Sequence, residues 1–373
     1  MALDLISVDD HIIEHGRVWT DRLAVKWHEL CPHVVEEGDR EFWVYDGNRS
    51  ETMGLNAVAG REREDYSTDP VRFSDMIPGC YEPAARVADM DRDGVRASLG
   101  FPSYPRFCGQ TFLMAGTDRE LGLLCVQAWN DFVLDEWCAT APDRFIPMII
   151  GPLWDPQGMA DEVERCAARG ARALSFCENP AKLGLPSLHD DHWDPLWRAC
   201  EQTETVVALH IGTSGSIPVT SPDAPVPVGI ALAGTLAQAA CTDIMMSRIQ
   251  PRFPNLRFAL SEGGIGWVPY ALERADYTWE RHRFWSGLGD DRKPSDVFRE
   301  CIWVCFIDDV AGLEMRERIG VDKIMWECDY PHSDSTWPHS QKRAAEVLGG
   351  LPDDEVAAIT HGNAERLFRW PAK

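Results

Sequence analysis

The chain has 373 residues with a formal net charge of −24, and its residues are 45% hydrophobic and 26% charged. This composition supports a large folded core and excludes global disorder. The negative charge should repel phosphate backbones and anionic bilayers, and no run approaches the roughly 18 apolar residues of a membrane helix, so we expect neither a nucleic-acid nor a membrane partner. Twelve cysteines without a CxxC pair, and an N-terminus without a basic leader, predict a cytoplasmic protein.

The first predicted strand is the apolar run at 3–9, which leads into Asp9 and His11. The region that follows it is irregular. Residues 41–45 alternate as a strand does, and an Asp-Gly-Asn-Arg turn comes directly after them. We therefore predict an insertion that bears a hairpin at about 36–80.

From residue 83 onward, predicted helices and strands alternate. Further apolar runs predict strands at 95–101, 145–150, 171–177, 206–210, 256–261, 302–307 and 323–328. Helices are predicted at 83–92, 118–141, 156–169, 193–203, 229–248, 267–284, 309–319, 339–348 and 352–368. The nearly continuous apolar runs are typical of parallel strands that are buried on both faces. Eight such units predict a (β/α)8 TIM barrel, as one domain over 1–373. A doubly wound open sheet is the alternative, but no Gly-rich phosphate loop follows the first strand.

Ionisable side chains close several of these strands. The set is Asp9, His11, Glu178, His210, Glu262 and Asp329. Asp9 and His11 lie two residues apart, so both point to the same side of their strand. In a (β/α)8 barrel the carboxyl ends of the strands form one mouth, where catalysis occurs. Because buried carboxylates without partners are costly, their convergence there predicts a metal site. Taken singly, each acid could instead be a helix N-cap.

Several motifs resemble the amidohydrolase superfamily. They are Asp9-x-His11 after the first strand, His210 after the fifth, and Cys328-Asp329-Tyr330-Pro331-His332 after the eighth. The chain is most similar to the amidohydrolase-related branch that includes the aminocarboxymuconate-semialdehyde and resorcylate decarboxylases. This resemblance implies a (β/α)8 barrel that binds zinc, manganese or another divalent ion. It also implies a hydrolase or a non-oxidative decarboxylase, often a homodimer or homotetramer.

Two positions depart from the decarboxylase pattern or extend it. The decarboxylases carry a histidine at the end of strand six, where this chain has Ser261 and Glu262. Glu262 is therefore a candidate general base or a ligand to a second ion. Glu178 ends strand four, where binuclear members of the superfamily place a bridging carboxylated lysine or glutamate. A bridging Glu178 would give a site for two ions, and a cap of the following loop is the alternative role.

Hydrolysis is the reaction that we expect first. A metal-bound water would attack a carbonyl, with Asp329 as ligand and base and His332 in support. Oxygen-rich ligand sets suit iron or manganese as well as zinc, and two histidines with four carboxylates match di-iron oxygenases, so a di-iron monooxygenase is the alternative. A non-oxidative decarboxylase is the second alternative. A non-catalytic barrel would have lost the ligands, which are all present.

The substrate is expected to be a small, hydrophobic carbonyl compound, such as a carboxylate or thioester. The predicted loops after strands two and four are long and carry basic side chains. Arg106 and Lys182 are candidate anchors for a substrate carboxylate, and His189 is a further candidate contact.

Overall fold

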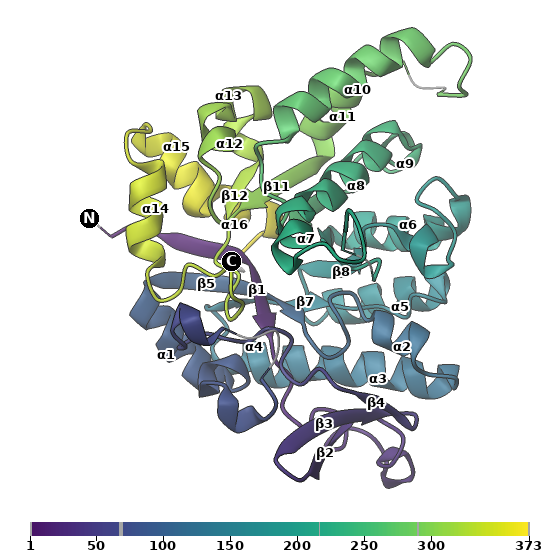
Figure 1. Ribbon diagram of the computed structural model, residues 1–373. Coiled ribbons are helices and arrows are strands. Elements are labelled where there is room, and N and C mark those ends of the chain that lie inside the picture. The colour runs from purple at the N-terminus through teal and green to yellow at the C-terminus, as the bar shows by residue number, and fades with distance from the viewer. Residues whose placement is uncertain (1, 67–69, 216, 289–290, 372–373) are drawn as a thin grey trace.

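The computed structural model describes residues 2–66, 70–215, 217–288 and 291–371, and its centre is a ring of parallel strands (Figure 1). The strands of the ring are β1 (Leu5–Ile12), β5 (Val95–Pro102), β6 (Phe145–Ile146), β7 (Met148–Ile149), β8 (Ala173–Cys177), β9 (Val206–His210), β10 (Phe258–Ser261), β11 (Ile302–Phe306) and β12 (Ile324–Trp326). They pair in this order in two sheets, β1-β5-β6 and β7-β8-β9-β10-β11-β12. Each predicted strand is present, and the predicted (β/α)8 barrel is confirmed.

Two junctions join these sheets into a ring. Pro147 separates β6 from β7, because proline has no N–H for the ladder, and its carbonyl oxygen accepts from the backbone N–H of Arg172 at 2.8 Å. On the other side, β1 meets the segment after β12. There the N–H of Asp329 donates to the carbonyl of Asp9 at 2.8 Å, and that of His11 donates to the carbonyl of Tyr330 at 2.7 Å.

Helices surround the ring, as Figure 1 shows. They are α1 (Pro83–Asp93), α2 (Gln110–Met114), α3 (Arg119–Phe132), α4 (Cys138–Thr140), α5 (Pro156–Ala167), α6 (Asp194–Thr203), α7 (Val226–Leu232), α8 (Gly234–Met246), α9 (Ile249–Arg252), α10 (Val268–His282), α11 (Pro294–Cys301), α12 (Val310–Glu314), α13 (Arg316–Ile319), α14 (Ser340–Leu348), α15 (Asp353–Ala357) and α16 (Asn363–Phe368). The predicted helix at 118–141 passes through a π-helical turn between α3 and α4. The sequence analysis missed α2, α9 and α11, which have only four to eight residues and too few turns for a clear helical period.

The insertion after β1 carries a three-stranded antiparallel sheet. Its strands are β2 (His33–Glu37), β3 (Arg40–Tyr45) and β4 (Asn48–Ser50), so the hairpin is confirmed and β2 is an addition. The sequence did not predict β2 because its side chains are half-buried or exposed and give no strong alternation. The buried ring of Trp43 on β3 stacks on Tyr104 from the loop after β5, with 4.5 Å between ring centroids. This contact holds the insertion against the barrel mouth.

Helices α7 and α8 form an apolar stretch beside the mouth. Val226–Met246 meets the length and composition of a membrane-spanning helix, which the sequence analysis did not anticipate. In the structure the buried face of α8, including Ala240, Cys241 and Ile244, packs on the barrel. Val226 and Ile230 on α7 are exposed. The apolar residues of α8 therefore pack in the core, whereas some of those of α7 remain exposed.

Candidate metal centre

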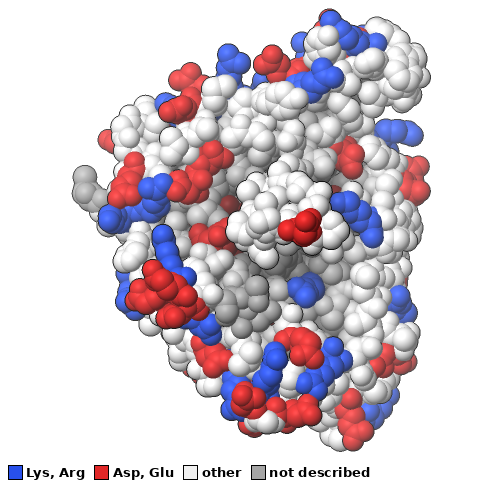
Figure 2. Space-filling model, viewed as in Figure 1, with Lys and Arg blue, Asp and Glu red and all other residues white. Residues whose placement is uncertain are grey.

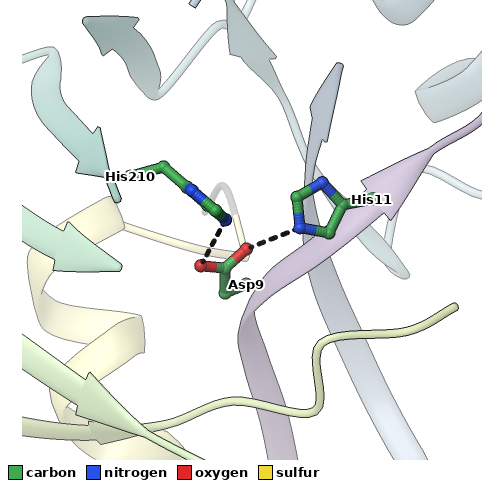
Figure 3. A group of neighbouring side chains, drawn as sticks. All are labelled: Asp9, His11 and His210. Carbon is green, nitrogen blue, oxygen red and sulfur yellow. Dashed lines mark ion pairs between the residues drawn. The ribbon is translucent and has the colours of Figure 1, made fainter. Parts of the chain in front are cut away.

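Three of the predicted ligands meet at the mouth of the barrel (Figure 3). Asp9 and His11 come from β1, and His210 is the last residue of β9. Oδ1 of Asp9 lies 3.6 Å from Nε2 of His11, and Oδ2 of Asp9 lies 3.6 Å from Nε2 of His210. All three side chains are fully buried. The sequence prediction that strand ends bring these residues together therefore agrees with their geometry.

Residues after β10 and β12 extend this group. Oδ1 of Asp329 lies 3.2 Å from Nε2 of His11 and 3.0 Å from Nδ1 of His332. Oε2 of Glu262 lies 2.9 Å from Nε2 of His210. Two sets of three residues therefore have ligand atoms close enough to bind one cation, and they share His11: Asp9, His11 and His210, and His11, Asp329 and His332.

The polar atoms of this group are buried without hydrogen-bond partners among the described residues. They are both carboxylate oxygens of Asp9 and of Asp329, both ring nitrogens of His11, and Nε2 of His210 and of His332. An unpaired buried polar group costs roughly 1–3 kcal/mol, and a charged one costs more. One such atom from each of several residues lies close enough to the others to bind the same cation, and each of those atoms would gain a partner by doing so.

The orientation of His210 supports the same conclusion. Its Nδ1 lies 2.6 Å from the carbonyl oxygen of Ile211, so Nδ1 carries the proton and donates it to that oxygen. Nε2, the other ring nitrogen, points to the carboxylates of Asp9 and Glu262, and as an unprotonated nitrogen it would present a lone pair to them. Lone pairs that face each other repel unless a cation lies among them. A backbone carbonyl that fixes the far nitrogen is the usual arrangement of a metal-binding histidine.

Charge around the centre is strongly negative. Burial raises the pKa of Asp9 well above its ordinary value, and the nearby carboxylates of Glu327 and Asp329 raise it further. Burial lowers the pKa of His11, and the neighbouring rings of His332 and His210 lower it further. Imidazole nitrogens beside clustered carboxylates are a donor set that suits a divalent ion.

Two of the acidic residues have a backbone conformation that is unusual for residues other than glycine. Glu262 has φ +57° and Asp329 has φ +61°, both in the left-handed region. Residues other than glycine rarely adopt this region, and such conformations cluster at functional sites. The N–H of Glu262 donates to Oε2 of Glu327 at 3.2 Å, and the N–H of Asp329 donates to the carbonyl of Asp9. These bonds hold both acids toward the mouth.

The sequence analysis missed two residues that support the centre. Glu327 lies in the barrel interior, where Sγ of Cys305 donates to it at 2.6 Å, and burial raises its pKa to about 8. The guanidinium of buried Arg86 on α1 donates to the carbonyl of His11 at 2.6 Å and to that of Gly79 at 2.7 Å. An acid within the last apolar strand was the available signal for Glu327. Arg86 gave none, because its partners are backbone atoms far along the chain.

Glu178 lies at the end of β8 but outside both sets of ligand atoms. Its Oε1 accepts a hydrogen bond from Oγ of Ser214 at 2.6 Å, and its Oε2 accepts one from the hydroxyl of Thr213. Its carboxylate is therefore satisfied by hydroxyl groups, and the bridging role stays a prediction.

A cavity of about 270 Å³ opens above the centre. Its lining residues include Glu262, Asp329 and His332, together with apolar side chains from α7, α8 and the loops. Arg106, Lys182 and His189 are not among its lining residues. His189 instead lies 3.3 Å from Asp243 at an exposed position. Arg106 directly precedes Phe107, which does line the cavity. Their roles as substrate contacts remain predictions.

The sequence matches a family of known proteins over nearly its whole length. The family model described as Amidohydrolase covers residues 15–370. Gamma-resorcylate decarboxylase of Rhodococcus jostii is 24% identical over 329 residues, which cover 82% of this chain and 97% of that protein.

Solved structures with the same fold are similar over the full chain. An amidohydrolase from Mycobacterium avium subsp. paratuberculosis has a TM-score of 0.78 at 21% identity, covering 99% of this chain and 100% of its own. A 5-carboxyvanillate decarboxylase from Novosphingobium aromaticivorans, solved with manganese and 4-hydroxy-3-methoxy-5-nitrobenzoic acid, has a TM-score of 0.68 at 18% identity and coverages of 98% and 96%. At these identities the similarity supports the barrel fold.

Proposed function

The chain belongs to the amidohydrolase family and is related to the gamma-resorcylate and aminocarboxymuconate-semialdehyde decarboxylases, and from this premise we propose that it is a metal-dependent non-oxidative decarboxylase of a small aromatic acid. The observation that carries the proposal is the set of unpaired buried ligand atoms of Asp9, His11, His210 and Asp329 at the cavity.

These four residues would hold one divalent ion. Manganese is the ion that we propose, because related decarboxylase structures contain it. When bound, the ion supplies a Lewis acid that fixes the oxygen atoms of the acid and stabilises the negative charge that develops.

The protein's own residues would handle the proton. In decarboxylation the bond between a ring carbon and the carboxyl carbon breaks, carbon dioxide leaves, and the ring carbon keeps the electron pair and binds a proton. Asp329 lines the cavity and would deliver that proton. His332 contacts Asp329 through Nδ1 at 3.0 Å, and its Nε2 is unpaired among the described residues. It would therefore return a proton to Asp329 after each turnover.

Hydrolysis, the reaction expected first from the sequence, becomes the second candidate. The relatives that are similar in sequence support decarboxylation better, since they are decarboxylases. The observation that favours hydrolysis is Glu262, whose carboxylate lines the cavity and could accept a proton from water. A di-iron oxygenase requires a second ion and molecular oxygen, so metal content and oxygen dependence separate it from both.

The test measures carbon dioxide release from 2,6-dihydroxybenzoate by the manganese-loaded protein, with and without oxygen. We expect release that does not depend on oxygen. Asp329→Asn should lower kcat by roughly 100-fold or more, because the proton donor is lost, while the circular dichroism spectrum stays unchanged.

Asp308→Asn is the matched control, since Asp308 is exposed and pairs with Arg343 at the surface. It should retain full activity. Consumption of the acid only in the presence of oxygen, or cleavage of esters without carbon dioxide release from any acid, would contradict decarboxylation.

A further inference from the structure

The cavity above the centre has two chemically different walls. One wall is apolar and consists of Phe107, Ile211, Ile217, Ile230, Leu236 and Ile307. The polar part of the lining includes Asn56, Glu262, Asp329, His332, Ser333 and Asp334. A ligand that satisfies both walls must be amphipathic, with its reacting group on the polar side.

Part of the apolar wall is exposed to solvent. Ile217 is 57% exposed and Ile230 on α7 is 49% exposed, whereas Leu236 at the start of α8 is only 7% exposed. The loop around Ile217 lies closely on α7: a side chain at Gly229 would come within 3.2 Å of Ile217 and of the carbonyl of Pro218. The wall is therefore a packed surface that presents branched side chains to the cavity.

The apolar surface continues outward from the cavity. Val219 and Val226 are strongly exposed at its rim. Figure 2 shows a mostly uncharged bulge at the place of α7 that carries one acidic group, and one basic group lies below it beside a hollow in this face of the molecule. Each CH₂ group of a ligand buried there would contribute about 0.8 kcal/mol, so an apolar substituent of the ligand is favoured at this position.

Charge limits the ligand further. Within the part of the chain that the structure describes, no lysine or arginine lines the cavity, whereas three carboxylates do: Glu262, Asp329 and Asp334. The first carboxylate of a substrate would be paired by the ion of the centre. A second anionic group would face carboxylates and isoleucines, with no lysine or arginine among the lining residues, and this surrounding disfavours a desolvated anion.

We propose that the site takes an aromatic monocarboxylic acid that bears an apolar substituent and no second anionic group, with the substituent against Ile217 and Ile230. This inference rests on the proposed function for the position of the carboxylate. It deepens that function by naming the substrate class, and it gives α7 the role of specificity wall.

The test measures the affinity of the manganese-loaded protein for 2-hydroxybenzoates by calorimetry. The compounds carry hydrogen, methyl, ethyl, propyl or carboxyl at position 4. Affinity should rise by up to about four-fold per methylene, and the 4-carboxyl compound should bind at least about ten-fold more weakly than the parent acid. An affinity that is flat along the alkyl series, or a 4-carboxyl compound that binds as well as the alkyl ones, would overturn the proposal.

Substitutions on the wall give a second, independent measurement. Ile230→Arg should reverse the preference, so that the 4-carboxyl compound binds more tightly than the propyl compound. Loss of folding could not produce this gain in affinity for the 4-carboxyl compound. Val310→Asp is the control, because Val310 is an exposed apolar residue outside the cavity, and it should leave the series unchanged. An unchanged preference in Ile230→Arg would show that the substituent does not lie against α7.

Carbon dioxide release from the same compounds is recorded separately. If the alkyl compounds bind tightly but release no carbon dioxide, the proposed decarboxylase activity is contradicted and the proposed ligand class is retained. If carbon dioxide is released as efficiently from the 4-carboxyl compound as from the alkyl compounds, the proposed ligand class is contradicted and the proposed decarboxylase activity is retained.

Discussion

The carboxylates at the mouth of the barrel contrast with two carboxylates just outside it. Asp9 and Asp329 are buried, and none of their four side-chain oxygens has a hydrogen-bond partner among the described residues. Glu14 and Glu178 are equally buried, yet their oxygens are fully engaged. Glu14 accepts from the N–H groups of Ser103 at 3.1 Å and Tyr104 at 2.7 Å and from Nε1 of Trp129 at 2.8 Å; Glu178 accepts from two hydroxyl groups.

This difference shows what marks a ligand site in a barrel. Burial of an acid is common to both groups and does not distinguish them. The missing partners distinguish them, because a folded protein tolerates unpaired buried carboxylates only when something else binds them. Removing a member of each group should therefore affect different properties: metal content for the first, and stability for the second.

The largest effect is expected from His210→Ala. The variant should bind manganese at least about 100-fold more weakly, beyond the roughly 10- to 100-fold that the loss of an outer hydrogen bond costs, and manganese should no longer raise its melting temperature. His189→Ala is the control, since its ring contacts only the exposed Asp243 in the described residues. If His210→Ala retained manganese fully, His210 would not be a ligand of the centre, and the contrast between the two groups of residues would not hold.

A smaller effect, on stability, is expected from Glu14→Gln. The amide nitrogen would face one of three N–H donors, which should cost about 1–3 kcal/mol in the free energy of unfolding while metal content stays normal. Burial raises the pKa of Glu14 to about 7. The raised pKa means that the folded state binds the proton more tightly, so this group's contribution to stability is present at low pH and is lost as pH rises through about 7.

Urea unfolding at pH 5 and pH 8 measures both expectations. The wild-type protein should exceed Glu14→Gln in stability by more at pH 5 than at pH 8. A difference that is equal at both pH values would contradict the assigned proton linkage, and a loss of metal in this variant would place Glu14 with the first group of acids.

The smallest effect is expected from Glu178→Gln. Because hydroxyl groups already satisfy its oxygens, the variant and the wild-type protein should both hold one ion per chain in elemental analysis. A wild-type chain with two ions and a variant with one would instead establish the bridging role that the sequence suggested and sharpen the case for a binuclear centre.

The ligands were predictable because the fold constrains them. Once the apolar runs indicate a parallel barrel, all strand ends meet at one mouth, so Asp9, His210 and Asp329 come together without knowledge of any loop. Arg86 and Glu327 escaped prediction because the tertiary structure alone brings them to their partners, the backbone carbonyl of His11 for Arg86 and the thiol of Cys305 and the N–H of Glu262 for Glu327.

The cavity was harder to predict than the centre. Its apolar wall comes from α7 and α8, an Ala-rich segment whose sequence does not show which face stays open. The directions of loop side chains follow no period, so the basic residues chosen as substrate anchors could not be placed from sequence alone.

The junction between β1 and the segment after β12 has a consequence for how the protein is made. The side chain of Asp10 accepts a hydrogen bond from the N–H of Tyr330 across 320 positions of sequence, and the proposed metal ligands Asp9 and Asp329 lie beside this contact. Asp9 and Asp329, which would hold the ion together, lie 320 positions apart in the sequence, so the second is synthesised long after the first. Capture of an ion by both would therefore be a late event in folding, and an ion bound across the junction would favour the closed barrel over chains in which these two segments have not met.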